Sequence, residues 1–193
     1  MAEVLLFHHA LGLTDGVVAL ADELRRAGHT VHTPDLFDGE TFDDLEVGVA
    51  YAQEVGFDVL AERGVAAADG LPKELVYAGI SLGVVPAQRL AQTRPGALGV
   101  LLLSGCVPED AFGPAWPEGV PVQVHAMDAD PFFVDDGDLD AARALVAGAE
   151  DRALFLYPGA EHLFVERGSA SFVPDASEAS FARIRDFLGG LAG

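Results

Sequence analysis

The stretch VYAGISLGVV, residues 76–85, is an apolar run that ends in Gly-Ile-Ser-Leu-Gly, after which a helix-like apolar pattern begins. This pattern indicates a buried strand that turns directly into a helix. Ser81 is the single polar side chain at the turn, between Gly79 and Gly83. Two interpretations are open: a tight turn that needs small residues, or a nucleophile elbow, in which a serine occupies a strained strand-to-helix turn.

The rest of the chain supplies the other elements of an α/β architecture. Short apolar runs alternate with longer amphipathic ones, which predicts a mostly parallel sheet with helices on both faces. The expected strands are Val4–His8, Thr30–Thr33, Leu75–Ala78, Leu98–Ser104, Val120–His125 and Ala153–Tyr157. The expected helices are Gly16–Ala27, one within Leu45–Ala67, Leu82–Thr93, Leu139–Ala147 and one within Ser177–Leu188. No linker or repeat divides the sequence, so we expect one domain over residues 1–193.

A serine at its ordinary pKa is a weak nucleophile, so a catalytic Ser81 would need a base and an acid that orients the base. Two histidines follow Ser81 in the sequence. His125 lies inside an alternating strand, where a structural role is expected. His162 lies just past a strand in a glycine-containing loop, which is where a general base belongs.

The acid is expected in HAMDADPFFVDD, residues 125–136, which follows a strand. Asp130 precedes a proline, which biases its backbone towards an extended conformation. We therefore favour Asp130 over the alternative Asp128. The order Ser81, Asp130, His162 is the chain order of nucleophile, acid and base in α/β-hydrolases.

Acyl transfer also needs two backbone N–H groups directed at the developing oxyanion. We expect one from Leu82, directly after the serine, and one from Ala10 in FHHALGL, residues 7–13. The adjacent pair His8 and His9 does not indicate a metal site, because neighbouring strand residues face opposite ways. Neither a metal nor another cofactor is expected.

Aromatic residues on loops after the predicted strands are candidates for the wall of a substrate pocket. The candidates are Phe37, Trp116, Phe132 and Phe133. Trp116 lies in the long irregular stretch Gly105–Pro121, and loops of this length without structure of their own are often functional.

With these motifs the chain resembles the dienelactone hydrolase family of α/β-hydrolases over nearly its whole length. Residues 5–39 are similar to the family's first core strand, helix and "PDLY-G" turn, and residues 76–83 to its elbow. Residues 124–134 resemble its acid loop and residues 157–164 its "GHxF" histidine loop. The resemblance implies the α/β-hydrolase fold without a large cap domain, and supports Asp130, which follows a histidine by five residues.

Three departures separate the chain from the family's type members. They carry cysteine where this chain has Ser81, and a glutamate where it has His9, which we count among the substrate-binding candidates. They hold a substrate carboxylate with arginines, one of them at the position of Glu166, next to Arg167. The hydrolase chemistry is therefore implied, but dienelactone as the substrate is not. Cys106 follows a buried strand away from the elbow, and we interpret it as structural.

Composition limits the partners. The net charge is −20, with 31 acidic and 11 basic residues, so the chain should repel nucleic acid and anionic membranes. No apolar stretch reaches the roughly 18 residues that span a bilayer. Cys106 is the only cysteine, which fits a reducing compartment, so we expect a cytoplasmic protein. We expect a small-molecule substrate and a monomer or homodimer.

Three functions compete at this point. The first is a small serine hydrolase that cleaves a compact ester, thioester or lactone through an acyl-enzyme. The second is a non-catalytic ligand-binding protein on the same fold, against which the intact Ser, Asp and His set argues. A peptidase is weaker, because the chain lacks room for a sizeable cap. Neither G-x-G-x-x-G nor a P-loop occurs, which argues against a nucleotide-binding protein.

Overall fold

The computed structural model describes residues 1–113, 115–147 and 149–191. Six parallel strands form one sheet in the order β2-β1-β3-β4-β5-β6. The strands are β1 (Glu3–Phe7), β2 (Thr30–His32), β3 (Leu75–Ile80), β4 (Ala97–Leu103), β5 (Val122–Met127) and β6 (Arg152–Tyr157). The predicted parallel sheet is confirmed, and the strand that leads to Ser81 lies in its interior between β1 and β4.

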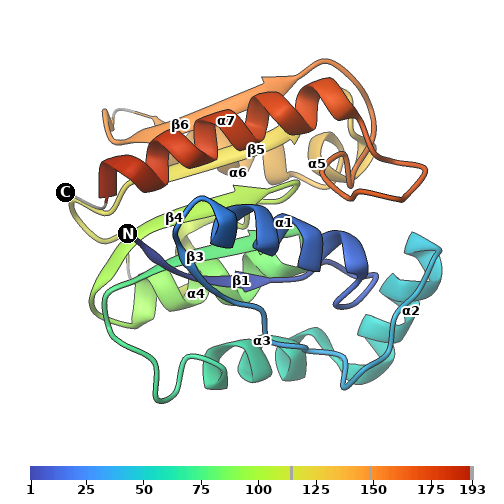
Figure 1. Ribbon diagram of the computed structural model, residues 1–193, viewed down its shortest axis with the longest axis horizontal. Helices are drawn as coiled ribbons and strands as arrows, with labels where there is room; N and C mark the ends of the chain where they lie inside the picture. Colours follow the sequence, from blue (N-terminus) through green and yellow to red (C-terminus); the bar gives the residue numbers. More distant parts are fainter. Residues whose placement is uncertain (114, 148, 192–193) are drawn as a thin grey trace.

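Helices cover both faces of the sheet (Figure 1). One face carries α1 (Asp15–Arg26) and α7 (Pro174–Leu191), which lie side by side. The opposite face carries α3 (Phe57–Ala66), α4 (Val84–Thr93) and α6 (Asp138–Val146). α2 (Leu45–Val55) lies beyond the carboxyl ends of the strands. Among the helices of the described residues, none is both long and apolar enough to cross a membrane.

The interior strands β3 and β4 are apolar on both faces because both faces are covered. Along β1, Val4 and Leu6 join the core beneath α1 and α7, whereas Leu5 and Phe7 join the core beneath the opposite helices. This alternation follows from the two-residue period of a strand. It explains why the sequence shows continuous apolar runs rather than alternating polar and apolar residues.

Local boundaries differ from the expected ones where a single residue decides the backbone. The helix expected within Leu45–Ala67 is two helices, because Gly56 adopts a φ of 99° between them. α5 (Pro131–Val134) was not expected, and it begins because Asp130 caps it. The irregular stretch Gly105–Pro121 contains the short 3₁₀ helix η2 (Glu109–Phe112).

His125 has the structural position that its place in a strand predicted. It is fully buried in β5, with its ring stacked at 5.1 Å from Phe155 and 6.1 Å from Tyr157. Nδ1 lies 2.9 Å from the Tyr157 hydroxyl and Nε2 lies 3.1 Å from the Gln123 amide oxygen. Burial, together with the charge of Arg183, lowers the pKa of His125 to about 3.

The buried neutral His125 predicts a loss of stability in mild acid. The unfolded chain binds a proton at this residue near its ordinary pKa of about 6.5, whereas the folded chain does not until pH falls to about 3. The free energy of unfolding should therefore fall as pH drops through this window, by about 2 kcal/mol between pH 7 and pH 5 from His125.

Denaturant unfolding of the wild type and of His125→Gln at pH 7 and pH 5 measures the contribution of His125 to this change in the free energy of unfolding. The difference in stability between the two proteins should shift by about 2 kcal/mol in favour of the variant at pH 5. A difference that is the same at both pH values would show that His125 does not resist protonation in the folded protein.

Candidate active site

Three residues meet where parallel strands end, on loops far apart in the sequence. Ser81 follows β3, Asp130 follows β5 and His162 follows β6. Ser81 Oγ lies 2.7 Å from His162 Nε2, and His162 Nδ1 lies 2.7 Å from Asp130 Oδ2. The structure thus brings together the three residues that the sequence placed as nucleophile, base and acid.

The turn that carries Ser81 is strained, and its glycines are required by close packing. Ser81 has a φ of 50°, in the left-handed region that residues other than glycine rarely adopt. A Cβ at Gly79 would lie 2.1 Å from the Gly83 carbonyl oxygen, and one at Gly83 would lie 2.4 Å from the Phe7 carbonyl oxygen. The glycines therefore let helix and strand approach closely around the half-buried Ser81, as a nucleophile elbow requires.

Asp130 is fully buried and uses both carboxylate oxygens. Oδ1 accepts the Phe132 N–H at 3.0 Å and so caps α5, while Oδ2 accepts from His162. Asp128 lies elsewhere: its Oδ1 accepts the Gly159 N–H at 3.0 Å and braces the loop before His162. The geometry favours Asp130 over Asp128 as the partner of the histidine.

The hydrogen bonds of His162 place its proton. Asp130 only accepts when ionised, so His162 carries its proton on Nδ1 and leaves Nε2 free to accept from the Ser81 hydroxyl. The imidazole is 9% exposed and lies beside the Phe132 ring at 4.8 Å. This arrangement can take a proton from Ser81 and return it to a leaving group.

The expected oxyanion donors lie on two segments that the elbow packs together. Leu82 is the second residue of η1 (Ser81–Gly83), directly after the serine. Gly83 lies against the carbonyl oxygens of Phe7 and His8, which brings the elbow next to the loop that carries Ala10. Ala10 is 3% exposed, and its N–H has no hydrogen-bond acceptor among the residues that the structure describes. It is therefore available as a donor.

Of the four aromatic residues expected to line a pocket, only Phe132 is exposed next to the histidine. The other three pack into the core: Phe37 and Phe133 are fully buried, and Trp116 donates from its indole N–H to the Val120 carbonyl. The expectation that these three residues line the pocket wall is therefore not supported, because they lie buried in the core. Large aromatic rings gain more by sealing the core beneath a loop than by facing solvent.

His9 offers no exposed surface to a substrate. It is fully buried, its Nε2 lies 2.9 Å from Glu166 Oε2, and its Nδ1 accepts the Leu11 N–H at 3.2 Å. Both ring nitrogens are thus used within the protein, and the expectation that His9 touches substrate needs correction. The two positions where this chain departs from the family's glutamate and arginine contact each other.

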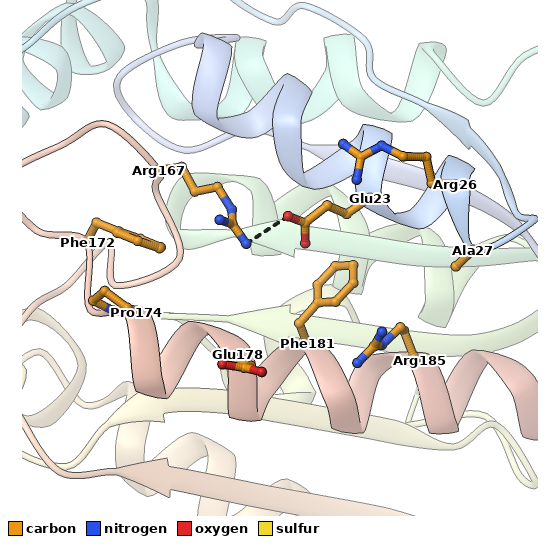
Figure 2. A pocket seen from close by; sticks show the side chains of 9 residues that line it. All are labelled: Glu23, Arg26, Ala27, Arg167, Phe172, Pro174, Glu178, Phe181 and Arg185. Carbon is orange, nitrogen blue, oxygen red and sulfur yellow. Dashed lines mark ion pairs between the residues drawn. The ribbon is translucent and has the colours of Figure 1, made fainter.

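Arg167, next to Glu166, forms an ion pair with a residue of α1. Figure 2 shows its guanidinium turned towards Glu23 of α1, with Nη2 2.7 Å from the carboxylate, and the group lies over the Phe172 ring at 5.4 Å. The hollow drawn there, about 490 Å³ between α1 and α7, includes none of Ser81, Asp130 and His162. Arg167 is therefore not placed to hold a substrate carboxylate beside Ser81.

Two apolar hollows do border the site. One of about 140 Å³ reaches Leu82, and one of about 230 Å³ lies between α2 and Phe132. The first is lined by Leu36, Phe57, Leu60, Ala61, Leu82, Val85 and Pro86. The second is lined by Leu45, Glu46, Val49, Ala50, Gln53 and Phe132. Both are small.

Cys106 does not compete as a nucleophile. The thiol is fully buried, and burial together with the Asp138 carboxylate raises the pKa of Cys106 to about 12. A thiol that stays protonated at neutral pH is a poor nucleophile. Within the described part of the chain, no group of three or more His, Cys, Asp or Glu side chains gathers in a way that could hold a metal ion.

Sequence reasoning missed the contacts of Glu166. Its Oε2 accepts from His9, and its Oε1 accepts from the Thr14 hydroxyl at 2.6 Å. Thr14 before an amphipathic helix is a recognisable N-cap signal, and its oxygen does accept the Val17 N–H. Nothing in the sequence shows that a glutamate 152 residues later joins the cap.

Fold and site together define an α/β-hydrolase. A family model for the dienelactone hydrolase family matches residues 1–191, and the chain belongs to that family. Membership of this family supports the conclusion that the protein is a hydrolase. Among curated proteins no sequence matches the chain.

Solved structures with the same fold agree with this assignment. A dienelactone hydrolase-like promiscuous phosphotriesterase from metagenomic libraries is 20% identical, with a TM-score of 0.79 over 99% of this chain and 87% of that one. A dienelactone hydrolase from Anabaena variabilis is 22% identical, with a TM-score of 0.68 over 98% and 86%. A cold-adapted esterase from an Arctic intertidal metagenomic library is 16% identical, with a TM-score of 0.67 over 96% and 82%. At these identities the likeness establishes the fold.

Proposed function

We propose that the protein is a serine hydrolase that cleaves a compact ester, thioester or lactone through an acyl-enzyme. The observation that carries the proposal is the hydrogen-bonded chain from Ser81 through His162 to Asp130, with both contacts at 2.7 Å, on a strained elbow. A nucleophile, a base and an orienting acid in this geometry are the requirements of acyl transfer. The proposed location is the cytoplasm, as the lone cysteine suggested.

In the first half of the proposed reaction, His162 Nε2 takes the Ser81 proton while Oγ bonds to the substrate carbonyl carbon. The carbonyl oxygen becomes an oxyanion, which accepts from the N–H groups of Ala10 and Leu82. The carbon–oxygen or carbon–sulfur bond then breaks, and His162 gives its proton to the departing alcohol or thiol. Asp130 holds the imidazole and stabilises its charge throughout.

Water completes the cycle. His162, neutral again, takes a proton from water, whose oxygen bonds to the acyl carbon. The second tetrahedral intermediate uses the same two N–H groups. Its collapse releases the carboxylic acid and returns the proton to Ser81 Oγ.

The small hollows beside Leu82 and Phe132 support a short acyl chain. A series of p-nitrophenyl esters from acetate to decanoate tests this, and kcat/KM should be highest for the shortest members. A hydrophobic pocket gains roughly 1–3 kcal/mol from one further methylene only while room remains, so the profile should fall once the chain outgrows the hollow. The absence of turnover across the series, with a correctly folded protein, would favour the alternative of a non-catalytic binding protein.

Substrate charge gives a further prediction. Arg167 is engaged by Glu23, and the whole chain carries a net charge of −20. The field of the protein should slow the approach of an anion, so kcat/KM at low salt should be about tenfold higher for a neutral ester than for a matched carboxylate-bearing ester. The gap should narrow as salt screens the field.

Steady-state kinetics with both esters at low and high ionic strength measures this ratio. Arg167→Ala provides a control and should leave the preference unchanged. A preference for the carboxylate-bearing ester that disappears in Arg167→Ala would show that the arginine reaches the substrate after all.

A further inference from the structure

We propose, on the basis of the function proposed above, that His8, His9, Thr14 and Glu166 form a clamp that fixes the Ala10 N–H in position for the oxyanion. We call these four residues the oxyanion clamp. They are positioning residues: none of them touches Ser81, Asp130 or His162 in a hydrogen bond of the described structure.

The first part of the clamp holds the His9 carbonyl. His8 is fully buried; its Nδ1 lies 2.7 Å from the His9 oxygen, and its Nε2 lies 2.9 Å from the Leu36 nitrogen. The Leu36 N–H is a donor, so Nε2 accepts and the proton of His8 is on Nδ1, where it donates to the carbonyl. Burial favours this neutral form, because it lowers the pKa of His8 to about 4. The Gly12 N–H donates to the same carbonyl at 3.1 Å.

Fixing this carbonyl also fixes the Ala10 N–H. The His9 carbonyl and the Ala10 N–H belong to one planar trans peptide and point in opposite directions. Rotation of that peptide would break both hydrogen bonds to the carbonyl. On the other side of the residue, the Ala10 carbonyl oxygen lies so close to Gly48 of α2 that a Cβ there would be 2.1 Å away. Ala10 is thus held from both sides, while its own N–H makes no hydrogen bond to any residue that the structure describes.

The second part of the clamp holds the His9 ring. Its Nδ1 accepts the Leu11 N–H, so its proton is on Nε2, which donates to Glu166. Glu166 is 5% exposed, and its other oxygen accepts from Thr14, the N-cap of α1. A Cβ at Gly16 would lie 2.3 Å from the carboxylate, so the first turn of α1 also confines it. Glu166 therefore connects the loop that carries His9 and Ala10 to the N-terminus of α1.

The position of Glu166 in the chain adds a connection to the base. It lies four residues after His162 in the same loop. The carboxylate that contacts the loop with the proposed oxyanion donor therefore comes from the same loop as the proposed base. A buried, unpaired N–H is costly and is rarely kept without a function. The geometry points to catalysis as the reason that Ala10 is held with its N–H open.

Glu166→Ala tests the clamp, with kcat and KM for p-nitrophenyl acetate and the inhibition constant of a trifluoromethyl ketone as readouts. The ketone forms a tetrahedral oxyanion on the serine, so it reports on the donors directly. We expect kcat to fall by about 10²-fold, near the loss of one oxyanion donor, while KM changes little. The inhibition constant should rise by the same factor as kcat falls.

Matched variants separate positioning from folding. Glu166→Gln keeps an acceptor for His9 and should restore most of kcat. Glu178→Ala makes the same truncation at an exposed glutamate of α7 and should leave kcat and the inhibition constant unchanged. If Glu166→Ala does not fold, His9→Asn replaces it, because asparagine can still accept from the Leu11 N–H but does not reach Glu166.

The outcomes distinguish the clamp from the proposed function. An active wild type whose kcat and ketone inhibition are unchanged in Glu166→Ala, even with a lower melting temperature, would show that the four residues serve folding alone. A fall in kcat without a parallel rise in the inhibition constant would also overturn the clamp. A wild type that neither hydrolyses the ester nor binds the ketone would refute the proposed function, and the clamp with it.

Discussion

Replacement of Ser81 by alanine is expected to lower kcat for a short p-nitrophenyl ester by a factor on the order of 10⁶, the loss seen when a serine protease loses its nucleophile. The hydroxyl is the atom that bonds to the carbonyl carbon, and no other group stands 2.7 Å from His162 Nε2 among the hydrogen bonds of the described residues. Alanine tolerates a φ of 50° about as poorly as serine does, so stability should hardly change.

The control for this variant is Cys106→Ala. Its thiol is buried, and its pKa is raised to about 12 by that burial and by Asp138, so it should contribute nothing to turnover. Activity should therefore survive in Cys106→Ala and vanish in Ser81→Ala at equal melting temperatures. Equal activity of Ser81→Ala and wild type would mean that hydrolysis occurs elsewhere in the molecule.

Replacement of Asp130 by asparagine should lower kcat by roughly 10⁴, as the equivalent change does in a serine protease. Asparagine can still cap α5 through its oxygen, but its NH₂ group then faces His162 Nδ1. The imidazole must accept that bond and carry its proton on Nε2, where it can no longer take a proton from Ser81. The loss should appear mainly in kcat, with KM little changed.

Asp128→Asn is the matched control for Asp130→Asn. The asparagine oxygen can still accept the Gly159 N–H, which is the contact that Asp128 makes in this structure. Its kcat should therefore stay close to that of the wild type. If kcat fell further in Asp128→Asn than in Asp130→Asn, the assignment of Asp130 as the orienting acid would be wrong.

The sheet could be predicted from sequence because its signals are local. Residues 76–85 carry both the apolar run and the glycines, and the strand, the turn and the helix lie where that pattern put them. Gly56 and Asp130 show the limit: each sets a helix boundary through a backbone angle or a cap, and neither effect has a periodic signature. Element boundaries are therefore less predictable than element types.

The meeting of Ser81, Asp130 and His162 could also be anticipated, because parallel strands bring their carboxyl ends to one edge of a sheet. Their catalytic roles stay a prediction until activity is measured. The orientation of side chains on loops could not be anticipated in the same way. Phe132 is exposed and Phe133 is buried, although the two are adjacent residues of the same type.

The pairing of His9 with Glu166 marks the same limit more strongly. Taken alone, His9 was a candidate for binding substrate, and Glu166 marked the position of an arginine that the family's type members carry. Only the fold shows that they lie 2.9 Å apart across 157 residues of sequence. Contacts of this kind depend on packing between distant segments, which local pattern does not encode.

Covalent labelling of the wild-type protein with a fluorophosphonate, followed by mass-spectrometric mapping of the modified peptide, tests the central claim most directly. A fluorophosphonate bonds to a serine only when a base activates the hydroxyl and N–H donors hold the phosphoryl oxygen. One label per chain is expected, on Ser81 within the peptide that contains VYAGISLGVV. A folded protein that takes no label, or takes it on a residue other than Ser81, would contradict the account.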